Sequence, residues 1–327
     1  LFDYYLMTNL KTYIVADLGG TNIRIAQSEQ GQVHSIESFQ CLEFDNINQV
    51  FTVYFQKYDC DNIVLCLAVA APVNQDQINM TNLAWSFSQT QLKTELNLLT
   101  LFVINDYLAT AASVPHLLPA EKLQIGQGRI QPNSPIAVCG PGTGLGVAYL
   151  IFADKRWQVL VGEGGHVDFA PGDPLEQDIL NILQKKYAHV SVERILSGRG
   201  LLELYQAICH INNVMPAPLS PEQISDKALT NDCSLCRESL SRFCAILGAF
   251  AGNLALNLAA FGGVYIAGGM VPNFTDFLQK SEFRQRFEAK GRYQNYNAAI
   301  PSFVVTAVNP GLKGAAIYLQ QKLSENN

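Results

Sequence analysis

Residues 13–27 read YIVADLGGTNIRIAQ, and this stretch decides the fold class. An apolar, β-branched run at 13–16 leads into a predicted turn at 17–22, and residues 23–27 then alternate apolar and polar. Alternation with a period of two is typical of a half-buried strand and not of a helix. The sequence therefore predicts a β-hairpin whose turn is rich in glycine.

The composition of this turn favours phosphate binding. Glycine accepts positive φ and a close backbone approach, so a Gly-Gly turn can direct its N–H groups at an anion. Asp17 beside it suits Mg²⁺, which prefers oxygen ligands. The P-loop and the dinucleotide fingerprint both run from a strand into a helix and use other glycine spacings. A strand–turn–strand arrangement instead predicts a phosphate-holding hairpin.

A second glycine hairpin is predicted at 136–151, IAVCGPGTGLGVAYLI. Its strands are expected at 136–139 and 147–151, with the turn at 140–146. The layout repeats that of the first hairpin although the two sequences differ. Since 327 residues suit two domains, we expect two related α/β lobes that face a shared cleft, each turn holding part of a nucleotide tail.

The composition predicts a globular protein and argues against nucleic-acid and membrane partners. Hydrophobic residues make up 48% of the chain and charged residues 15%, which predicts a sizeable core. The formal net charge is −6, and the absence of a long basic run argues against a nucleic-acid partner. No uninterrupted apolar stretch is long enough for a membrane span, and residues 244–260 are expected to form a buried helix. The N-terminal segment is a poor signal peptide, so we expect a cytoplasmic protein.

The eight cysteines are scattered through the chain, which predicts reduced thiols. Cys233 and Cys236, with Cys244 further on, suggest zinc at first sight. A structural zinc site needs four ligands, usually as two close pairs. Only one pair is visible here, so we expect buried thiols.

The chain is expected to divide into two lobes and to contain further helices and strands. The small lobe is expected to comprise 1–115 plus 308–327 and the large lobe 116–307. Residues 115–135 are rich in Pro and Gly, and the first crossing between the lobes is expected near 115. Hinges are expected near 113–116 and 306–310. Asp173 can cap one helix, with Pro174 at its first position. Strands are predicted at 63–69, 101–104, 158–161, 264–267 and 302–308, and helices at 46–57, 88–97, 107–114, 174–187, 199–209, 235–260, 275–279 and 311–323.

Asp106 is the candidate general base. It follows a predicted strand and precedes a predicted helix, and α/β sheets place their ligands at such strand ends. A carboxylate there can accept a proton from a hydroxyl group. Asp is also among the preferred helix caps, and from position alone the two interpretations are equally weighted.

Glu163 and His166 lie in the segment GEGGHVD at 162–168. Both side chains can hydrogen-bond vicinal hydroxyls, and the flanking glycines allow close approach. The alternatives are a zinc site, for which no obvious third ligand lies nearby, and a structural turn.

A third glycine pair, Gly268–Gly269, ends the predicted strand at 264–267. Such a pair lets a flat ring lie against the backbone, which suits a purine or ribose. A tight strand–helix turn explains these glycines equally well.

Seven segments in this order resemble the ATP-dependent bacterial glucokinases, within the sugar kinase and actin-like ATPase superfamily. The resemblance extends from about residue 13 to residue 319. DxGGT alone is weak and is shared by many kinases, whereas the full set is specific. The segments are ADLGGTN (16–22), MTNLAWSFS (80–88), INDYLATA (104–111), GPGTGLGVA (140–148), GEGGHVDFAP (162–171), SVERILSGRGL (191–201) and GGVYIAGGMVP (262–272).

The resemblance implies an α/β, two-lobed actin-like ATPase (ribonuclease H-like) fold, with mixed sheets and a cleft between the lobes. It also implies the roles of the site residues. Asp106 matches the catalytic base. The residues that match sugar ligands are Asn82, Asn105, Asp106, Glu163, His166 and Glu193. The matching nucleotide-binding residues are Ala16, Asp17, Leu18, Gly19, Gly20, Thr21, Gly142, Thr143, Gly144, Gly268 and Gly269, with Asp17 holding Mg²⁺ through water.

The implied reaction transfers the γ-phosphoryl group of ATP to the 6-hydroxyl of glucose, giving glucose 6-phosphate and ADP. A glycolytic, cytoplasmic homodimer with no membrane or nucleic-acid partner is implied as well. The alternatives are a hexokinase of broader specificity, a non-catalytic sugar sensor or regulator, and an actin-like filament or chaperone ATPase. No helix-turn-helix segment precedes residue 13 in the sequence, which argues against a regulator.

Overall fold

The computed structural model describes residues 11–80 and 83–325. The chain divides into two compact units. Unit 1 comprises Leu1–His116 and Val308–Asn327, and unit 2 comprises Leu117–Ala307. Each unit has its own mixed sheet and its own hydrophobic core.

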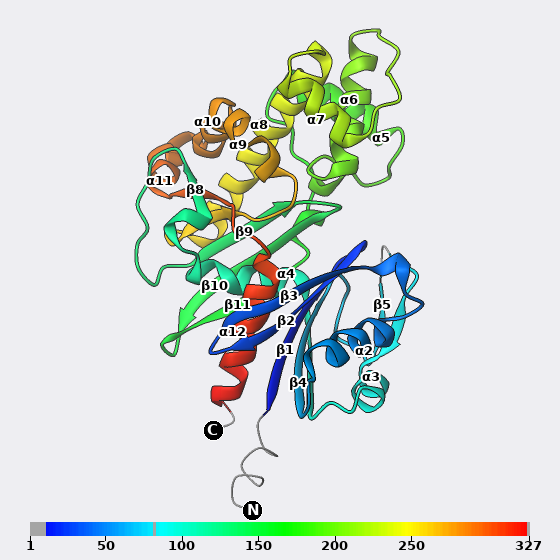
Figure 1. The fold of residues 1–327 in the computed structure, drawn as a ribbon. Helices are drawn as coiled ribbons and strands as arrows, with labels where there is room; N and C mark the ends of the chain where they lie inside the picture. Colours follow the sequence, from blue (N-terminus) through cyan, green and yellow to red (C-terminus); the bar gives the residue numbers. More distant parts are fainter. Residues whose placement is uncertain (1–10, 81–82, 326–327) are drawn as a thin grey trace, which may run out of the picture. The chain divides into compact units, whose positions relative to one another are not determined.

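Unit 1 contains a five-stranded sheet in the order β3-β2-β1-β4-β7 (Figure 1). Strand β1 pairs antiparallel with β2 and parallel with β4, and β4 pairs parallel with β7. A separate two-stranded ribbon joins β5 to β6. The strands are β1 (Thr12–Leu18), β2 (Asn22–Glu29), β3 (Gln32–Gln40), β4 (Ile63–Val69), β5 (Gln77–Asn79), β6 (Ser86–Ser88) and β7 (Thr100–Asn105).

Helices cover both faces of this sheet, which explains why β4 is an unbroken apolar run buried at every position. Alternate β1 residues point to opposite faces: Ile14 packs with α2 (Ile47–Tyr58) and α3 (Gln89–Glu95), and Val15 packs with α4 (Asp106–Ser113) and α12 (Pro310–Glu325). The C-terminal helix α12 therefore completes the core of the unit that contains the first hairpin.

Unit 2 contains a six-stranded sheet in the order β11-β10-β9-β12-β13-β8. Strand β9 pairs antiparallel with β10 and parallel with β12, and β12 pairs parallel with β13. Five of its strands therefore repeat the arrangement in unit 1, with β8 added at one edge. The strands are β8 (Lys122–Ile125), β9 (Ile136–Pro141), β10 (Leu145–Ala153), β11 (Arg156–Gly162), β12 (Gly263–Ile266) and β13 (Ser302–Val305).

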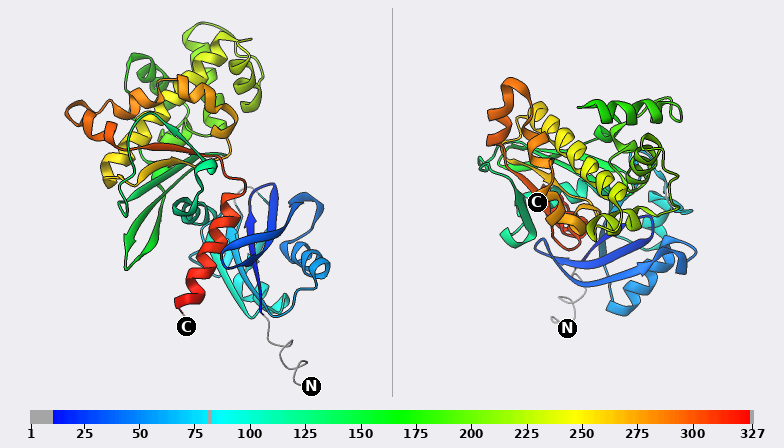
Figure 2. Two further views of the ribbon diagram at one scale, coloured as in Figure 1. Left: turned by 60° about the vertical axis from the view of Figure 1, so that its left-hand side comes forward. Right: turned by 90° about the horizontal axis from the view of Figure 1, so that it is seen from above.

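Helix α8 (Ser234–Leu258) lies across this sheet and forms much of the core of unit 2 (Figure 2). It is long and apolar enough to cross a membrane by length and composition, but 72% of its most apolar window is buried inside the protein. That degree of burial is typical of a core helix, as the sequence predicts. The other helices are α5 (Pro174–Gln184), α6 (Gly198–Ile211), α7 (Pro221–Leu229), α9 (Thr275–Lys280), α10 (Phe283–Glu288) and α11 (Gln294–Ala299).

The two hairpins are confirmed, but both turns are shorter than predicted. The first strand continues through Asp17 and Leu18, and only residues 19–21 form the turn. In the second hairpin β9 continues to Pro141 and β10 begins at Leu145, so the turn is 142–144. Cross-strand pairing extends the strands to the edge of each glycine segment.

The start of α5 is also confirmed, because Asp173 accepts the N–H of Glu176 and Pro174 is the first helical residue. The predicted strand at 302–308 was too long, since β13 ends at Val305, and the helix predicted at 174–187 ends at Gln184. The elements that the sequence analysis missed include β3, β8, α7, α10 and α11.

Candidate functional site

The first turn leaves two amides available to a ligand. The N–H of Gly19 donates to the carbonyl of Asn22 at 2.9 Å and closes the hairpin. The N–H groups of Gly20 and Thr21 donate to none of the described residues. A ligand at this turn can therefore accept two adjacent backbone hydrogen bonds.

Asp17 supplies a carboxylate beside these amides. Burial raises its pKa above the ordinary value, and the positive charge of Arg24 on β2 opposes that shift. Among the described residues, none donates a hydrogen bond to this carboxylate. Helix α12 approaches it so closely that a Cβ on Gly311 would lie 2.5 Å from its Oδ2 atom. Asp17 is therefore a confined carboxylate that accepts no hydrogen bond within residues 11–80 and 83–325.

Ala16 and Leu18, which were also predicted to bind the nucleotide, differ from Asp17 in having side chains that no ligand can reach. Both side chains are fully buried in the core of unit 1, and both residues pair with strands on either side. Their backbone positions hold Asp17 and the turn in register, while their side chains are enclosed by protein.

Asn105, and not Asp106, caps α4. The Oδ1 atom of Asn105 accepts the N–H groups of Tyr107 and Leu108 at 2.9 and 3.2 Å. Asp106 is the first helical residue, and its Oδ1 accepts the N–H of Tyr107 at 2.8 Å. The cap of α4 is therefore Asn105, and the interpretation of Asp106 as the cap was wrong. Only the Oδ1 atom of Asn105 is used in the cap, so its Nδ2 group can still donate a hydrogen bond.

The second turn is built in the same way as the first. The N–H of Gly142 donates to the carbonyl of Gly144 at 2.8 Å, while Thr143 and Gly144 donate their N–H groups to none of the described residues. The carbonyl of Gly142 accepts the N–H of Gly198 at 2.9 Å, which fixes the turn to the start of α6.

Three of the predicted sugar ligands come together in unit 2. The ring of His166 lies between two carboxylates: its Nε2 is 3.9 Å from Oε2 of Glu163, and its Nδ1 is 4.0 Å from Oε1 of Glu193. His166 and Glu193 also line a cavity of about 310 Å³, which is in the size range of small-molecule sites. His166 and Glu193 therefore face one cavity, whose lining does not include Glu163.

Leu145 connects this group to the second turn. Its N–H donates to Oε2 of Glu193 at 2.7 Å. Its carbonyl lies against Gly165, where a Cβ would approach that oxygen to 2.3 Å. Close approach of backbone to backbone therefore explains one of the glycines between Glu163 and His166. This supports the structural-turn interpretation for Gly165, and the ligand interpretation of Glu163 and His166 stays a prediction.

A short antiparallel bridge holds the two ligand-bearing segments together. Asp168 pairs with Ser191, flanked by the N–H of Val192 donating to the carbonyl of Val167 and the N–H of Phe169 donating to the carbonyl of Val190. The side chain of His189 reaches Asp168 at 2.8 Å across the same bridge. Residues 163–166 and Glu193 are thereby fixed relative to each other.

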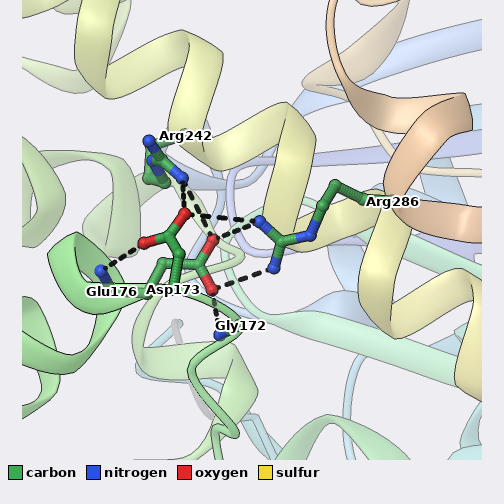
Figure 3. A network of polar contacts seen from close by, with 5 residues as sticks. All are labelled: Gly172, Asp173, Glu176, Arg242 and Arg286. Carbon is green, nitrogen blue, oxygen red and sulfur yellow. Dashed lines mark hydrogen bonds and ion pairs between the residues drawn. The ribbon is translucent and has the colours of Figure 1, made fainter. Parts of the chain in front are cut away.

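A buried ionic network anchors the chain just beyond this segment (Figure 3). Glu176 is fully buried; it pairs with both terminal nitrogens of Arg286 at 2.7 and 3.0 Å and accepts the N–H of Gly172 at 2.6 Å. Arg242 pairs with Asp173 and lies 3.4 Å from Glu176. Burial alone would raise the pKa of Asp173, but the N–H of Glu176 and the two arginines hold it below the ordinary value.

The third glycine pair has two different environments. A Cβ on Gly268 would lie 2.3 Å from the carbonyl oxygen of Pro141, whereas a Cβ on Gly269 would meet nothing within 4 Å. Gly268 is therefore required by the packing of the turn against the end of β9, and Gly269 is open to a ligand.

The cysteine pair is explained by helix capping. The Sγ atom of Cys233 accepts the N–H of Cys236 at the start of α8, while Cys236 and Cys244 are buried as predicted. All eight cysteines are unpaired thiols. In residues 11–80 and 83–325 no group of three or more His, Cys, Asp or Glu side chains forms a metal-binding cluster.

A family model described as Glucokinase matches residues 14–322. The chain belongs to the glucokinase family. A glucokinase of Colwellia psychrerythraea is 48% identical over 316 residues, which cover 94% of this chain and 96% of that protein. A glucokinase of Photorhabdus laumondii is 46% identical over 313 residues, which cover 95% and 98% of the two chains.

Among solved structures, a glucokinase from an Antarctic psychrotroph is similar with a TM-score of 0.86 and 36% identity, over 96% of this chain and all of that one. The resemblance drawn from the seven motifs and the expected actin-like ATPase fold are therefore confirmed. Asn82 lies outside the described residues.

Sequence reasoning missed two residues, Leu145 beside Glu193 in unit 2 and Gly311 beside Asp17 in unit 1. The hydrogen bond of Leu145 to Glu193 comes from its backbone N–H, while its side chain packs in the core. Gly311 lies 294 positions from Asp17, so no local pattern marks either contact. The position of Gly311, second in a helix that begins with Pro310, is the one available signal, and it indicates a helix start and not a site.

Proposed function

We propose that this glucokinase-family chain transfers the γ-phosphoryl group of ATP to the 6-hydroxyl of glucose. The observation that carries the proposal is the arrangement of His166 between Glu163 and Glu193, in a chain that matches the family over almost its full length. Carboxylate and imidazole groups in this order can bind several hydroxyls of one sugar.

Each unit supplies a different part of the chemistry. In unit 1, Asp106 orients the 6-hydroxyl and accepts its proton, and the Nδ2 group of Asn105 donates to a sugar hydroxyl. In unit 2, Glu163, His166 and Glu193 hold the remaining hydroxyls. Phosphoryl transfer depends mostly on positioning and charge stabilisation, so fixed ligands on the sugar contribute directly to the rate.

The two glycine turns bind the phosphates of ATP. Their paired N–H groups, from Gly20 and Thr21 and from Thr143 and Gly144, donate to phosphate oxygens. Gly269 presents open backbone to the adenosine, and Gly268 holds that backbone in place. Gly142 contributes by closing its turn.

The surroundings of Asp17 fit Mg²⁺. Its carboxylate is confined and has a raised pKa, so a cation would relieve an unfavourable charge. A single carboxylate also suits an ion that keeps most of its waters, and we propose that Asp17 holds Mg²⁺ through water. When bound, the ion neutralises negative charge on the phosphates.

We also propose a cytoplasmic location and a homodimeric assembly. Eight unpaired thiols fit a reducing compartment, which supports a cytoplasmic location, and the family resemblance supports a homodimer. Light scattering of the purified protein tests the assembly.

A coupled assay of ADP formation tests the function. The full chain is mixed with Mg-ATP and glucose, mannose, fructose or N-acetylglucosamine in parallel. We expect the highest kcat/KM with glucose. Comparable rates with several hexoses would indicate a broader hexokinase. Binding of glucose without ADP formation would indicate a sensor, and equal ADP formation without sugar would indicate an ATPase.

A further inference from the structure

The carboxylate of Glu193 has its two oxygens in different environments. Oε2 accepts the N–H of Leu145 at 2.7 Å, directly after the second turn. Oε1 points toward His166, whose Nδ1 lies 4.0 Å away. The side chain is 31% exposed. Oε2 is fixed to the backbone, whereas Oε1 accepts no hydrogen bond from the described residues.

The space for Oε2 exists because residue 144 has no side chain. A Cβ built on Gly144 would lie 2.6 Å from Oε2 and 3.3 Å from Cδ of Glu193. Carbon and oxygen do not approach this closely without bonding, so a methyl group at 144 would displace the carboxylate from the N–H of Leu145. The adjacent glycine differs, because a Cβ on Gly142 would meet nothing within 4 Å.

The backbone of Glu193 would not follow its carboxylate. The carbonyl of Glu193 accepts the hydroxyl of Ser197 at 2.9 Å, and the N–H of Gly198 is bonded to the carbonyl of Gly142. Residues 193–198 are thus held together by the Ser197 hydroxyl and fixed to the second turn by the N–H of Gly198. The end of a flexible side chain is the part that can move.

We propose that Gly144, in addition to offering its N–H at the phosphate turn, is a positioning residue for sugar recognition. The missing side chain at 144 keeps Glu193 on the N–H of Leu145, and this contact aims Oε1 at the sugar. The inference rests on the proposed function only in taking Glu193 as a sugar ligand. It predicts that a substitution at Gly144, in the turn proposed to bind ATP phosphates, changes the affinity for glucose.

The test compares Gly144→Ala with Gly142→Ala in the full chain. Glucose affinity is measured by calorimetry without ATP, so that any effect on nucleotide binding is excluded. Loss of a hydrogen bond to a charged group predicts that Gly144→Ala raises the glucose Kd by about 10- to 100-fold. The Gly142→Ala variant should bind glucose within about twofold of the unmodified protein, whatever its KM for ATP. An equal glucose Kd in the two variants would overturn the inference.

A double-mutant cycle separates this contact from a general disturbance of the turn. Glu193→Asp shortens the side chain and makes room for a methyl group at 144. In that background Gly144→Ala should change the glucose Kd by less than about threefold relative to Glu193→Asp alone, because both substitutions act through the same contact and their effects are not additive. The same fold-loss in both backgrounds would contradict the proposal.

Amide hydrogen exchange gives a readout that does not depend on the folding of Gly144→Ala. The N–H of Leu145 should exchange faster in Glu193→Asp than in the unmodified protein, since the shorter carboxylate no longer reaches it. Unchanged exchange would exclude the Glu193–Leu145 contact. If the unmodified protein fails to bind glucose, the proposed function fails, whereas this exchange result still decides whether the contact exists.

Discussion

The two glycine turns are alike in their amides and opposite in their carboxylates. In each turn the first glycine closes the hairpin, and the next two N–H groups donate to none of the described residues. Asp17 beside the first turn has a raised pKa and no donor among the described residues. Glu193 beside the second turn accepts a backbone N–H. A carboxylate without donors attracts a cation, whereas a carboxylate already fixed by a donor is a directed acceptor for a hydroxyl.

This comparison predicts that variants in the two units affect different quantities. Changes near the first turn should alter the rate and the response to Mg²⁺. Changes that displace the carboxylate of Glu193 beside the second turn should alter the affinity for the sugar.

The largest effect is expected at Asp106. Asp106→Ala should lower kcat by about 10²–10⁴-fold, the usual contribution of a general base, while glucose affinity measured by calorimetry stays close to that of the unmodified protein. Asp106→Asn is the matched control for shape and should be equally slow. Unchanged turnover in both variants would remove Asp106 as the base.

The next effect concerns the ionic network that anchors the second unit. Glu176→Gln removes a fully buried charge that two arginines share. Breaking such a pair costs about 3–5 kcal/mol, measured as the free energy of unfolding in urea. Glu37→Gln, which breaks the exposed pair with Lys57, serves as control and should cost less. Equal losses would show that the buried network contributes no more than a surface pair.

Gly311→Ala is expected to have an intermediate effect, because its Cβ would lie 2.8 Å from Cγ of Asp17. Overpacking of this kind costs about 1–3 kcal/mol. If Asp17 holds Mg²⁺, the Mg²⁺ concentration that gives half-maximal activity should rise by about tenfold. A loss of about 1.4 kcal/mol in Mg²⁺ binding corresponds to this factor of ten.

The control for Gly311→Ala lies one turn further along α12. A Cβ on Gly314 would lie 1.6 Å from the carbonyl oxygen of Ala109 on α4. Gly314→Ala should therefore lower stability without changing the Mg²⁺ requirement of the folded fraction. An identical Mg²⁺ response in the two variants would contradict a specific effect on Asp17.

The smallest effect is the pH dependence caused by Asp17. Its pKa is raised by burial from the ordinary 3.8, so the protonated form is favoured in the folded state. The stabilising contribution is complete below the pKa of the unfolded chain and is lost as the pH rises through the folded value. Without Mg²⁺, Asp17→Asn should melt a few degrees higher than the unmodified protein at pH 7, and the difference should shrink toward pH 4.

Mg²⁺ supplies the second half of that experiment. It should raise the melting temperature of the unmodified protein at pH 7 by mass action, but not that of Asp17→Asn. The exposed Asp61→Asn serves as control and should respond as the unmodified protein does. A Mg²⁺ response retained in Asp17→Asn would place the ion elsewhere.

Local patterns were sufficient for much of the fold. The β-branched runs, the Asp173–Pro174 start and the long apolar helix all appear where periodicity predicts them. Strand β3 was missed because its nine residues, QVHSIESFQ, alternate between exposed and half-buried and carry little apolar content. Helix α7 has a complete Ser220–Gln223 capping box, a signal that was present and went unused.

The site was predictable only where its parts are close in sequence. Glu163 and His166 are three residues apart and indicated a ligand-binding segment on their own. Glu193 was predicted only through the family resemblance. Its hydrogen bond to Leu145 spans 48 positions, so no local pattern could indicate it. The cap of α4 is Asn105, whereas the sequence left Asp106 open as either a cap or a base. Asn and Asp are both preferred caps and are adjacent here, so propensity alone cannot rank them.

The contact between Glu193 and Leu145 uses the main chain of position 145, and main-chain groups are shared by nineteen of the twenty amino acids. Replacing the leucine with another residue, proline excepted, would leave that hydrogen bond available, so a survey of substitutions at 145 would report on packing alone. An amide-to-ester exchange at this peptide bond would delete the donor and keep the side chain. Chemical synthesis, and not conventional mutagenesis, can therefore isolate the link between sugar ligand and phosphate turn.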